Sequence, residues 1–146
     1  AGKSGASSGY MCSLPDELQQ KLKKFRLRKE KNVAAIVLKI DREKMEVCVE
    51  TEVQDCSIED IVEELSEHQP RYLLLSYVHS YPDGRVTYPL MFIFSTPRDS
   101  NPELQVLYTG TIKTVIDVVG LTKVFEIRST DELDEEWLQQ KLEFYR

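Results

Sequence analysis

The stretch RYLLLSYVHSYPDGRVTYPLMFIFST, residues 71–96, carries the strongest structural signal in the chain. Two apolar runs, Arg71–His79 and Arg85–Thr96, flank the turn-forming sequence Tyr81-Pro82-Asp83-Gly84. We therefore expect an antiparallel hairpin. Pro89 lies inside the second run and predicts a bulge or an unpaired backbone position there.

Upstream of the hairpin, the pattern predicts two strands between two helices. Residues 33–40 are almost continuously apolar, as in a strand covered on both faces, whereas residues 45–53 alternate like a half-exposed strand. A first helix is expected from about Pro15 to Phe25. A second helix is expected to begin after the cap Ser57 and to end before Pro70.

Downstream, a long helix is expected to begin at Ser100/Asn101 and Pro102 and to run to about Val119, with Gly110 as a site of bending. A short strand, Lys123–Arg128, and a last helix, about Thr130–Tyr145, follow. The resulting order is α-β-β-α-β-β-α-β-α. It predicts one α+β domain in which a mixed sheet of five or six strands lies between helices.

Length and composition agree with a single globular domain. The chain has 146 residues, 41% of them hydrophobic and 30% charged. Residues 1–9 are Gly, Ser and Ala with one Lys, so we expect a flexible tail or a cloning remnant, with the domain at residues 12–146. No apolar stretch approaches the roughly 20 residues that cross a bilayer, and no leader is recognised. The three cysteines fit no metal motif, which predicts a reduced cytosolic protein without a cofactor.

The net charge of −6 conceals a basic segment. Residues 21–31 contain seven Lys or Arg and one Glu, so this segment carries +6 and the remainder −12. If the chain becomes extended after Phe25, Lys24, Arg26 and Arg28 share one face. Such a strip favours an acidic protein surface as partner. A nucleic acid is the weaker alternative, since the isoelectric point is about 5.0 and no exposed aromatic residues are expected between the basic ones.

The flank of the long helix is more apolar than an exposed face requires. Ile112 and Ile116 lie there, beside Thr109. Two interpretations remain open: a broader buried face, or an anchor that enters a groove on a partner.

Catalytic motifs are lacking: the chain has no phosphate-binding loop, dinucleotide fingerprint, nucleophile elbow or zinc-protease motif. A thiol pair of Cys48 with His68 or His79 is the remaining enzyme alternative. Buried cysteines on strands are more often structural, and we predict that the protein is not an enzyme.

Several stretches carry a family resemblance. They are residues 21–41, 69–97 and 121–142, with FIFSTP at 92–97 and VLYT at 106–109. The chain resembles the actin-depolymerising-factor homology domain, and within that superfamily it is similar to the glia maturation factor branch. Cofilin-type members usually carry Trp at the position of Ser95, and the serine found here also resembles the glia maturation factor branch.

The resemblance implies a non-enzymatic monomer of the cytoplasm and actin cytoskeleton. It implies binding to the actin-related protein 2/3 complex, inhibition of branched nucleation and promotion of debranching, with the first actin subunit of a branch as a further partner. The rival within the superfamily is a protein of the actin-depolymerising factor and cofilin type, which binds and severs actin filaments directly.

The resemblance also implies two binding surfaces. The residues implied for the main surface are Lys23, Lys24, Arg26, Arg28, Thr109, Ile112, Lys113 and Ile116. Those implied for a second surface are Tyr81, Asp83, Arg85, Glu135 and Glu136. Relatives commonly place Lys where this chain has Ile112. The electrostatic contribution to binding is therefore expected to come mainly from the cations that follow the first helix.

Overall fold

Two strands that are largely buried on both faces form the middle of the fold. In the computed structural model, which describes residues 11–121 and 123–143, they are β1 (Ala34–Asp41) and β3 (Arg71–Ser76). The two strands pair antiparallel. Continuous apolar runs suit this position because both faces of a central strand lie away from water. The predicted doubly covered strand is confirmed.

The main sheet has five strands in the order β2-β1-β3-β6-β7. The three strands not yet named are β2 (Glu46–Gln54), β6 (Leu90–Ser95) and β7 (Val124–Ile127). All neighbours are antiparallel except β6 and β7, which are parallel. The expected mixed sheet is therefore confirmed, with five strands in the described part of the chain.

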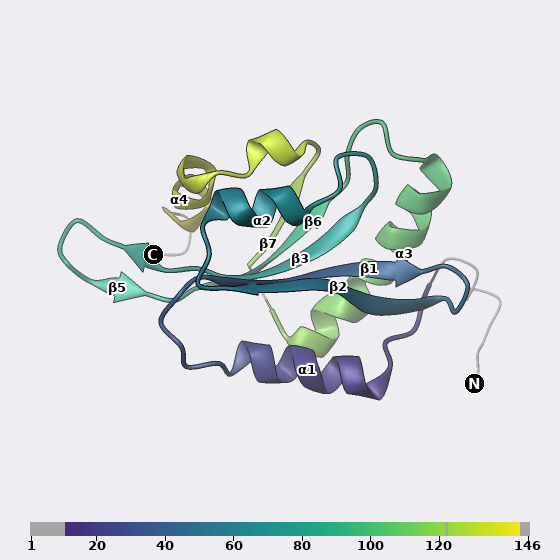
Figure 1. Cartoon of the computed structure of the whole chain (residues 1–146), viewed down its shortest axis with the longest axis horizontal. Helices are drawn as coiled ribbons and strands as arrows, with labels where there is room; N and C mark the ends of the chain where they lie inside the picture. The colour runs from purple at the N-terminus through teal and green to yellow at the C-terminus, as the bar shows by residue number, and fades with distance from the viewer. Residues whose placement is uncertain (1–10, 122, 144–146) are drawn as a thin grey trace.

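Four α-helices of the described chain cover the two faces of this sheet (Figure 1). α1 (Asp16–Arg26) and α3 (Pro102–Val119) pack on one face, and α2 (Ile58–Glu64) and α4 (Glu135–Glu143) pack on the other. Alternate residues of a strand point to opposite faces. Each central strand therefore contributes side chains to two separate apolar cores, one under each pair of helices.

Local chemistry sets the bounds of α3. Oδ1 of Asn101 accepts a hydrogen bond from the Glu103 N–H at 2.7 Å, and Pro102 occupies the first turn, where its missing N–H has no cost. The helix ends at Gly120, whose φ of 76° lies in the left-handed region that favours glycine. The predicted bounds are confirmed, and the helix continues through Gly110 without a break.

The hairpin is less regular than two uninterrupted strands. β4 (His79–Ser80) and β5 (Val86–Thr87) form a two-stranded sheet of their own, separate from β3 and β6. Pro89 lacks an N–H for the ladder, and its carbonyl accepts a hydrogen bond from the Tyr77 N–H at 3.0 Å. The predicted irregularity at Pro89 is confirmed, but each of the two long strands predicted here is divided in two.

The last helix begins later than predicted. Thr130–Glu132 form a single 3-10 turn, η2, and α4 starts only at Glu135. Asp134 explains this boundary, since its Oδ1 accepts a hydrogen bond from the Trp137 N–H at 2.8 Å, as a helix N-cap does.

Two sequence predictions lie outside the described residues. They are the flexible tail at residues 1–9 and the end of the last helix at Tyr145. Within the described ranges, no helix combines the length and the apolar character needed to cross a membrane.

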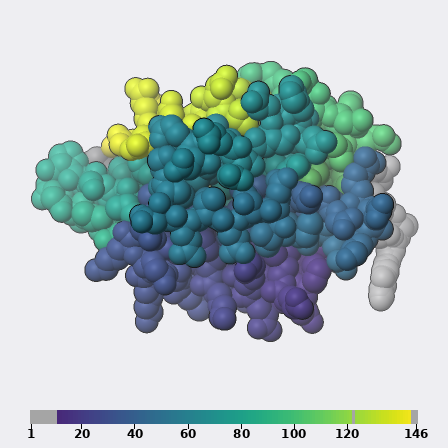
Figure 2. Space-filling model, viewed as in Figure 1, coloured from purple at the N-terminus to yellow at the C-terminus, as the bar shows by residue number. Residues whose placement is uncertain are grey.

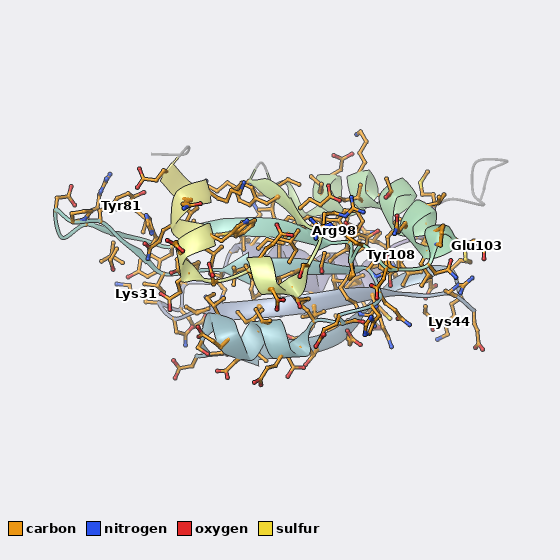
Figure 3. All side chains as sticks on the ribbon, turned by 90° about the horizontal axis from the view of Figure 1, so that it is seen from above. Lys31, Lys44, Tyr81, Arg98, Glu103 and Tyr108 are labelled. Atoms are coloured by element: carbon orange, nitrogen blue, oxygen red, sulfur yellow. The ribbon has the colours of Figure 1, made fainter. Side chains whose placement is uncertain are left out.

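Polar side chains of β2, β3 and α3 form hydrogen bonds near the core. Nε and Nη2 of Arg71 donate to the two carboxylate oxygens of Glu50 at 2.7 and 3.2 Å, and these hydrogen bonds hold the pKa of Glu50 below its ordinary value of 4.5. The hydroxyl of Tyr108, labelled in Figure 3, accepts from the Ile40 N–H at 2.9 Å. The Tyr72 hydroxyl donates to the Tyr108 carbonyl. The two tyrosine bonds fix α3 against β1 and β3, while the Arg71–Glu50 pair joins β3 to β2.

Candidate partner-binding surfaces

The last turn of α1 presents cations that remain unpaired. Lys23, Lys24 and Arg26 are exposed, and within the described residues none of the three forms an ion pair. Lys21, one turn earlier, instead pairs with Glu52 at 2.9 Å. We call Lys23, Lys24 and Arg26 the basic surface. Its positive charge is free to meet an acidic partner.

The structure corrects the expected geometry after Phe25. α1 continues through Arg26, and the Leu27 N–H donates to the carbonyls of Lys23 and Lys24 at 3.3 and 3.1 Å. The backbone therefore still follows the helix where an extended conformation was predicted. The prediction that Arg26 and Arg28 share one face, which assumed an extended backbone, is wrong.

Arg28 turns inward instead of joining the basic surface. Its Nη1 donates to the Asn32 carbonyl and to Oγ of Ser76, both at 3.0 Å, and its Nη2 donates to Oδ1 of Asn32 at 2.6 Å. Only 10% of the Arg28 side chain is exposed. In this structure its guanidinium fastens the loop between α1 and β1 to the end of β3.

The flank of α3 fits the broader buried face in part, and its role as an anchor for a partner stays a prediction. Ile112 and Ile116 are half-buried and pack against the apolar core under α1 and α3. Thr109 and Lys113 are exposed, and Nζ of Lys113 pairs with Oδ2 of Asp117 at 2.8 Å, which raises the pKa of Lys113. The isoleucines therefore border the outward face of α3 while they also support the fold.

The C-terminal ends of α1 and α3 meet at Gly120. A Cβ atom there would lie 2.9 Å from Nη1 of Arg26, so a side chain would displace the guanidinium. α3 has no basic residue in its last turn, and the C-terminal end of a helix carries partial negative charge. Arg26 supplies a positive charge there from the neighbouring helix. The basic surface and the end of α3 are thus adjacent (Figure 1).

The hairpin groups three residues of the second predicted surface. It projects from one end of the molecule in Figure 2, and Figure 3 places Tyr81 on it. The Tyr81 ring contacts the His79 ring at a centroid distance of 4.5 Å and the Arg85 guanidinium at 4.0 Å. Asp83 accepts a hydrogen bond from the Arg85 N–H at 2.9 Å. Tyr81, Asp83 and Arg85 therefore form one ordered group.

The start of α4 lies beside the root of this hairpin. Oε1 of Glu135 accepts a hydrogen bond from the Tyr77 hydroxyl at 3.3 Å, while burial and the Glu135 charge raise the pKa of Tyr77. Glu136 is exposed on the same helical turn. The structure thus brings Glu135 close to the segment between β3 and β4, with Glu136 next to it.

The structure shows no contact between Cys48 and either histidine of the thiol-pair alternative within the described residues. Cys48 lies on β2, and no hydrogen bond joins it to either histidine within the described chain: His68 bonds Oδ2 of Asp99 at 2.8 Å, and His79 packs against Tyr81. The described residues likewise contain no group of three His, Cys, Asp or Glu arranged to hold a metal ion.

Among the exposed apolar residues that sequence reasoning missed, two belong to α3 or to the end of α1. Leu27, directly after the basic surface, is 72% exposed, and Val106 on α3 is 49% exposed. Val106 precedes Thr109 by three residues, so helical spacing could have placed it on the outward face of α3. Leu27 carried no such signal, because its exposure depends on where α1 ends.

Comparison with known proteins identifies the family. A family model described as cofilin/tropomyosin-type actin-binding protein matches residues 11–143. The chain belongs to this family. The description of this family names actin binding.

Within the cofilin/tropomyosin-type family, the similar proteins include glia maturation factors. Human glia maturation factor beta is 47% identical over 140 residues, which are 96% of this chain and 99% of the relative. The Drosophila melanogaster glia maturation factor is 46% identical over 136 residues, or 93% and 99% of the two chains. The resemblance to this branch is confirmed.

Solved structures of family members share the fold. The solution structure of glia maturation factor from Caenorhabditis elegans superposes with a TM-score of 0.78 at 44% identity, covering 90% of this chain and 95% of that one. A crystal structure of Streptomyces griseoflavus cofilin gives 0.77 at 17% identity, covering 89% and 96%. The second likeness speaks for the fold alone.

Proposed function

We propose that this protein binds the actin-related protein 2/3 complex, inhibits branched actin nucleation and promotes debranching of actin filaments. The observation that carries the proposal is the unpaired basic surface beside the end of α3, on a chain that is 47% identical to human glia maturation factor beta. Cations without internal partners are expected to steer and orient an acidic surface.

The proposed contact has two parts. The outward face of α3, with Thr109, Lys113 and the bordering Ile112 and Ile116, enters an apolar cleft of an actin-related subunit. The basic surface meets carboxylates at the border of that cleft. Binding shifts the complex toward an inactive or debranched state only to the extent that it is tighter in that state. No bond is made or broken by this chain.

The second surface gives debranching a physical basis. Its hairpin residues, Tyr81, Asp83 and Arg85, form an ordered group, and Glu135 and Glu136 lie at the nearby start of α4. We propose that this surface contacts the first actin subunit of a branch. A monomer with two surfaces can compete for the junction between that subunit and the complex, at the actin cytoskeleton of the cytoplasm.

A pull-down with purified complex tests the proposal. The wild-type chain is expected to retain the actin-related protein 2/3 complex, and the variant Lys23→Ala/Lys24→Ala is expected to retain about tenfold less, since two cations that face the partner are removed. Lys44→Ala is the matched control, because Lys44 is also an exposed lysine and lies toward the other end of the molecule (Figure 3). Equal retention by all three proteins contradicts the proposed surface.

The rival function is direct binding and severing of actin filaments, of which the family description names actin binding. Cosedimentation separates the two. Pelleting with bare filaments, together with no retention of the complex, supports the rival. Retention of the complex with little pelleting supports the proposal made here.

A further inference from the structure

At the end of α1, an apolar residue is exposed and the charged residue that follows it is largely buried. Leu27 is 72% exposed, the largest value among the large apolar side chains of the described residues. Arg28, the next residue, leaves only 10% of its side chain exposed. Leucine is normally buried and arginine normally exposed, so this turn keeps the apolar side chain in water and the charged one inside.

The backbone of this turn is held rigidly. The Leu27 N–H bonds the carbonyls of Lys23 and Lys24, and the Arg28 N–H bonds the Phe25 carbonyl at 3.2 Å. Hydrogen bonds from Arg28 to the α1–β1 loop and to β3 hold the chain on the other side of Leu27. Leu27 is thus presented on a fixed support, and a fixed contact residue loses little conformational entropy when it binds.

Cations outnumber acids around Leu27 in the sequence: the one acid of residues 21–31 is Glu30, whose Oε1 lies 3.7 Å from Nε of Arg28. The basic surface precedes it, and Lys29 and Lys31 follow it, both exposed. An apolar side chain inside a positive field matches a partner that offers an apolar recess with carboxylates at its rim. A nucleic acid offers negative charge without such a recess, so the chemistry favours a protein.

We propose that Leu27 is the apolar anchor of the basic surface and inserts into an apolar, acid-rimmed recess of its protein partner. This inference rests on the proposed function, in which that partner is the actin-related protein 2/3 complex. Local breaches of the usual polarity rules are expected at functional positions. Binding would then remove Leu27 from water and leave its cationic neighbours paired.

Binding titrations with the purified complex test the anchor. Burying a leucine contributes roughly ten- to a hundredfold in affinity, so Leu27→Ala is expected to bind at least about tenfold more weakly. Leu27→Met, which keeps an apolar side chain of similar volume, is expected to bind within about threefold of wild type. Val124→Ala is the control, since it truncates another exposed apolar residue, on β7. Thermal melting checks that Leu27→Ala remains folded, and Leu27→Gln provides a second variant of similar length.

The outcomes are distinguishable. Selective weakening by Leu27→Ala and Leu27→Gln supports the anchor. Unchanged binding of these variants, with loss of binding in Lys23→Ala/Lys24→Ala, removes the anchor and leaves the proposed function standing. Failure of the wild-type chain to bind the complex removes the proposed function and this partner together. If Leu27→Ala loses only its retention on phosphatidylserine vesicles, the anchor serves a lipid surface and the present proposal is overturned.

Discussion

Arg28 shows how one residue can exchange an expected binding role for a structural one. The sequence places it among seven basic residues that look equivalent. Its position two residues past the end of α1 turns the guanidinium toward Asn32 and Ser76, where it donates three hydrogen bonds of 2.6–3.0 Å. A charged donor with fixed acceptors and little exposure contributes to folding rather than to a mobile surface charge.

Replacing Arg28 is therefore expected to destabilise the protein. We expect Arg28→Ala to lower the free energy of unfolding by about 1.5–3 kcal/mol, the range for hydrogen bonds that involve a charged group. Urea denaturation measures this, with Lys29→Ala as the exposed neighbouring control, for which a change within about 0.5 kcal/mol is expected. Equal midpoints for the two variants contradict the structural role.

The Glu50–Arg71 pair gives the stability a defined pH dependence. The pKa of Glu50 is lower in the folded chain than its ordinary 4.5, so the folded state binds fewer protons at this site than the unfolded state. The contribution is therefore complete above about pH 4.5 and is lost as the pH falls through the folded pKa.

Glu50→Gln is expected to be less stable than wild type by about 1–3 kcal/mol at pH 7, because Arg71 loses its charged acceptor. The difference is expected to shrink at a second, acidic pH well below 4.5, because there the unfolded state takes up a proton at Glu50 more readily than the folded state. Chemical denaturation of both proteins at the two pH values measures it. A difference that stays constant with pH would show that Glu50 is not the titrating group.

At the scale of the element, α3 is both a structural helix and a candidate binding helix. Its inner side packs against the sheet, and its outer side holds Thr109 and Lys113, with the half-buried Ile112 and Ile116 at the boundary. A change at the boundary should affect both folding and binding, while a change on the outer side should affect binding alone.

Ile112→Ala is expected to lower the free energy of unfolding by about 1–3 kcal/mol, less than the cost for a fully buried isoleucine, and also to weaken binding to the complex. Lys113→Ala is expected to leave stability within about 0.5 kcal/mol. Thermal melting and the pull-down, performed on both variants, separate the two effects. An Ile112→Ala protein with wild-type stability would show that Ile112 contributes little to the core.

At the scale of the whole molecule, stability should be unevenly distributed. β1 and β3 lie inside a five-stranded sheet with apolar cores on both faces, whereas β4 and β5 pair over only two residues each and project from the body (Figure 2). Exchange of backbone amide hydrogens reports the free energy of local opening.

Hydrogen exchange monitored by mass spectrometry is expected to find the slowest amides in β1 and β3 and faster exchange in the β4–β5 hairpin. The difference should reach several orders of magnitude in rate, because the hairpin can open without disturbing either core. Similar protection in the hairpin and in β3 would mean that the hairpin unfolds only together with the sheet.

Much of the fold was predictable because local chemistry and tertiary packing agree. The caps of α3, the turn at residues 81–84 and the continuous apolar run of β1 each indicate the structure that forms. Element ends were less predictable. Asp134 delays α4, and Pro89 divides the hairpin, because one hydrogen bond or one missing donor decides such boundaries.

The sequence by itself determined the element order outside the divided hairpin and the 3-10 turn before α4, the mixed sheet and the family, since these depend on periodicity, turn residues and extended similarity along the chain. Only the tertiary structure decided which members of the basic segment face solvent. The physical reason is geometric: where α1 stops fixes the direction of each following side chain, and acceptors from the α1–β1 loop and from β3 draw Arg28 inward while Leu27 remains outside.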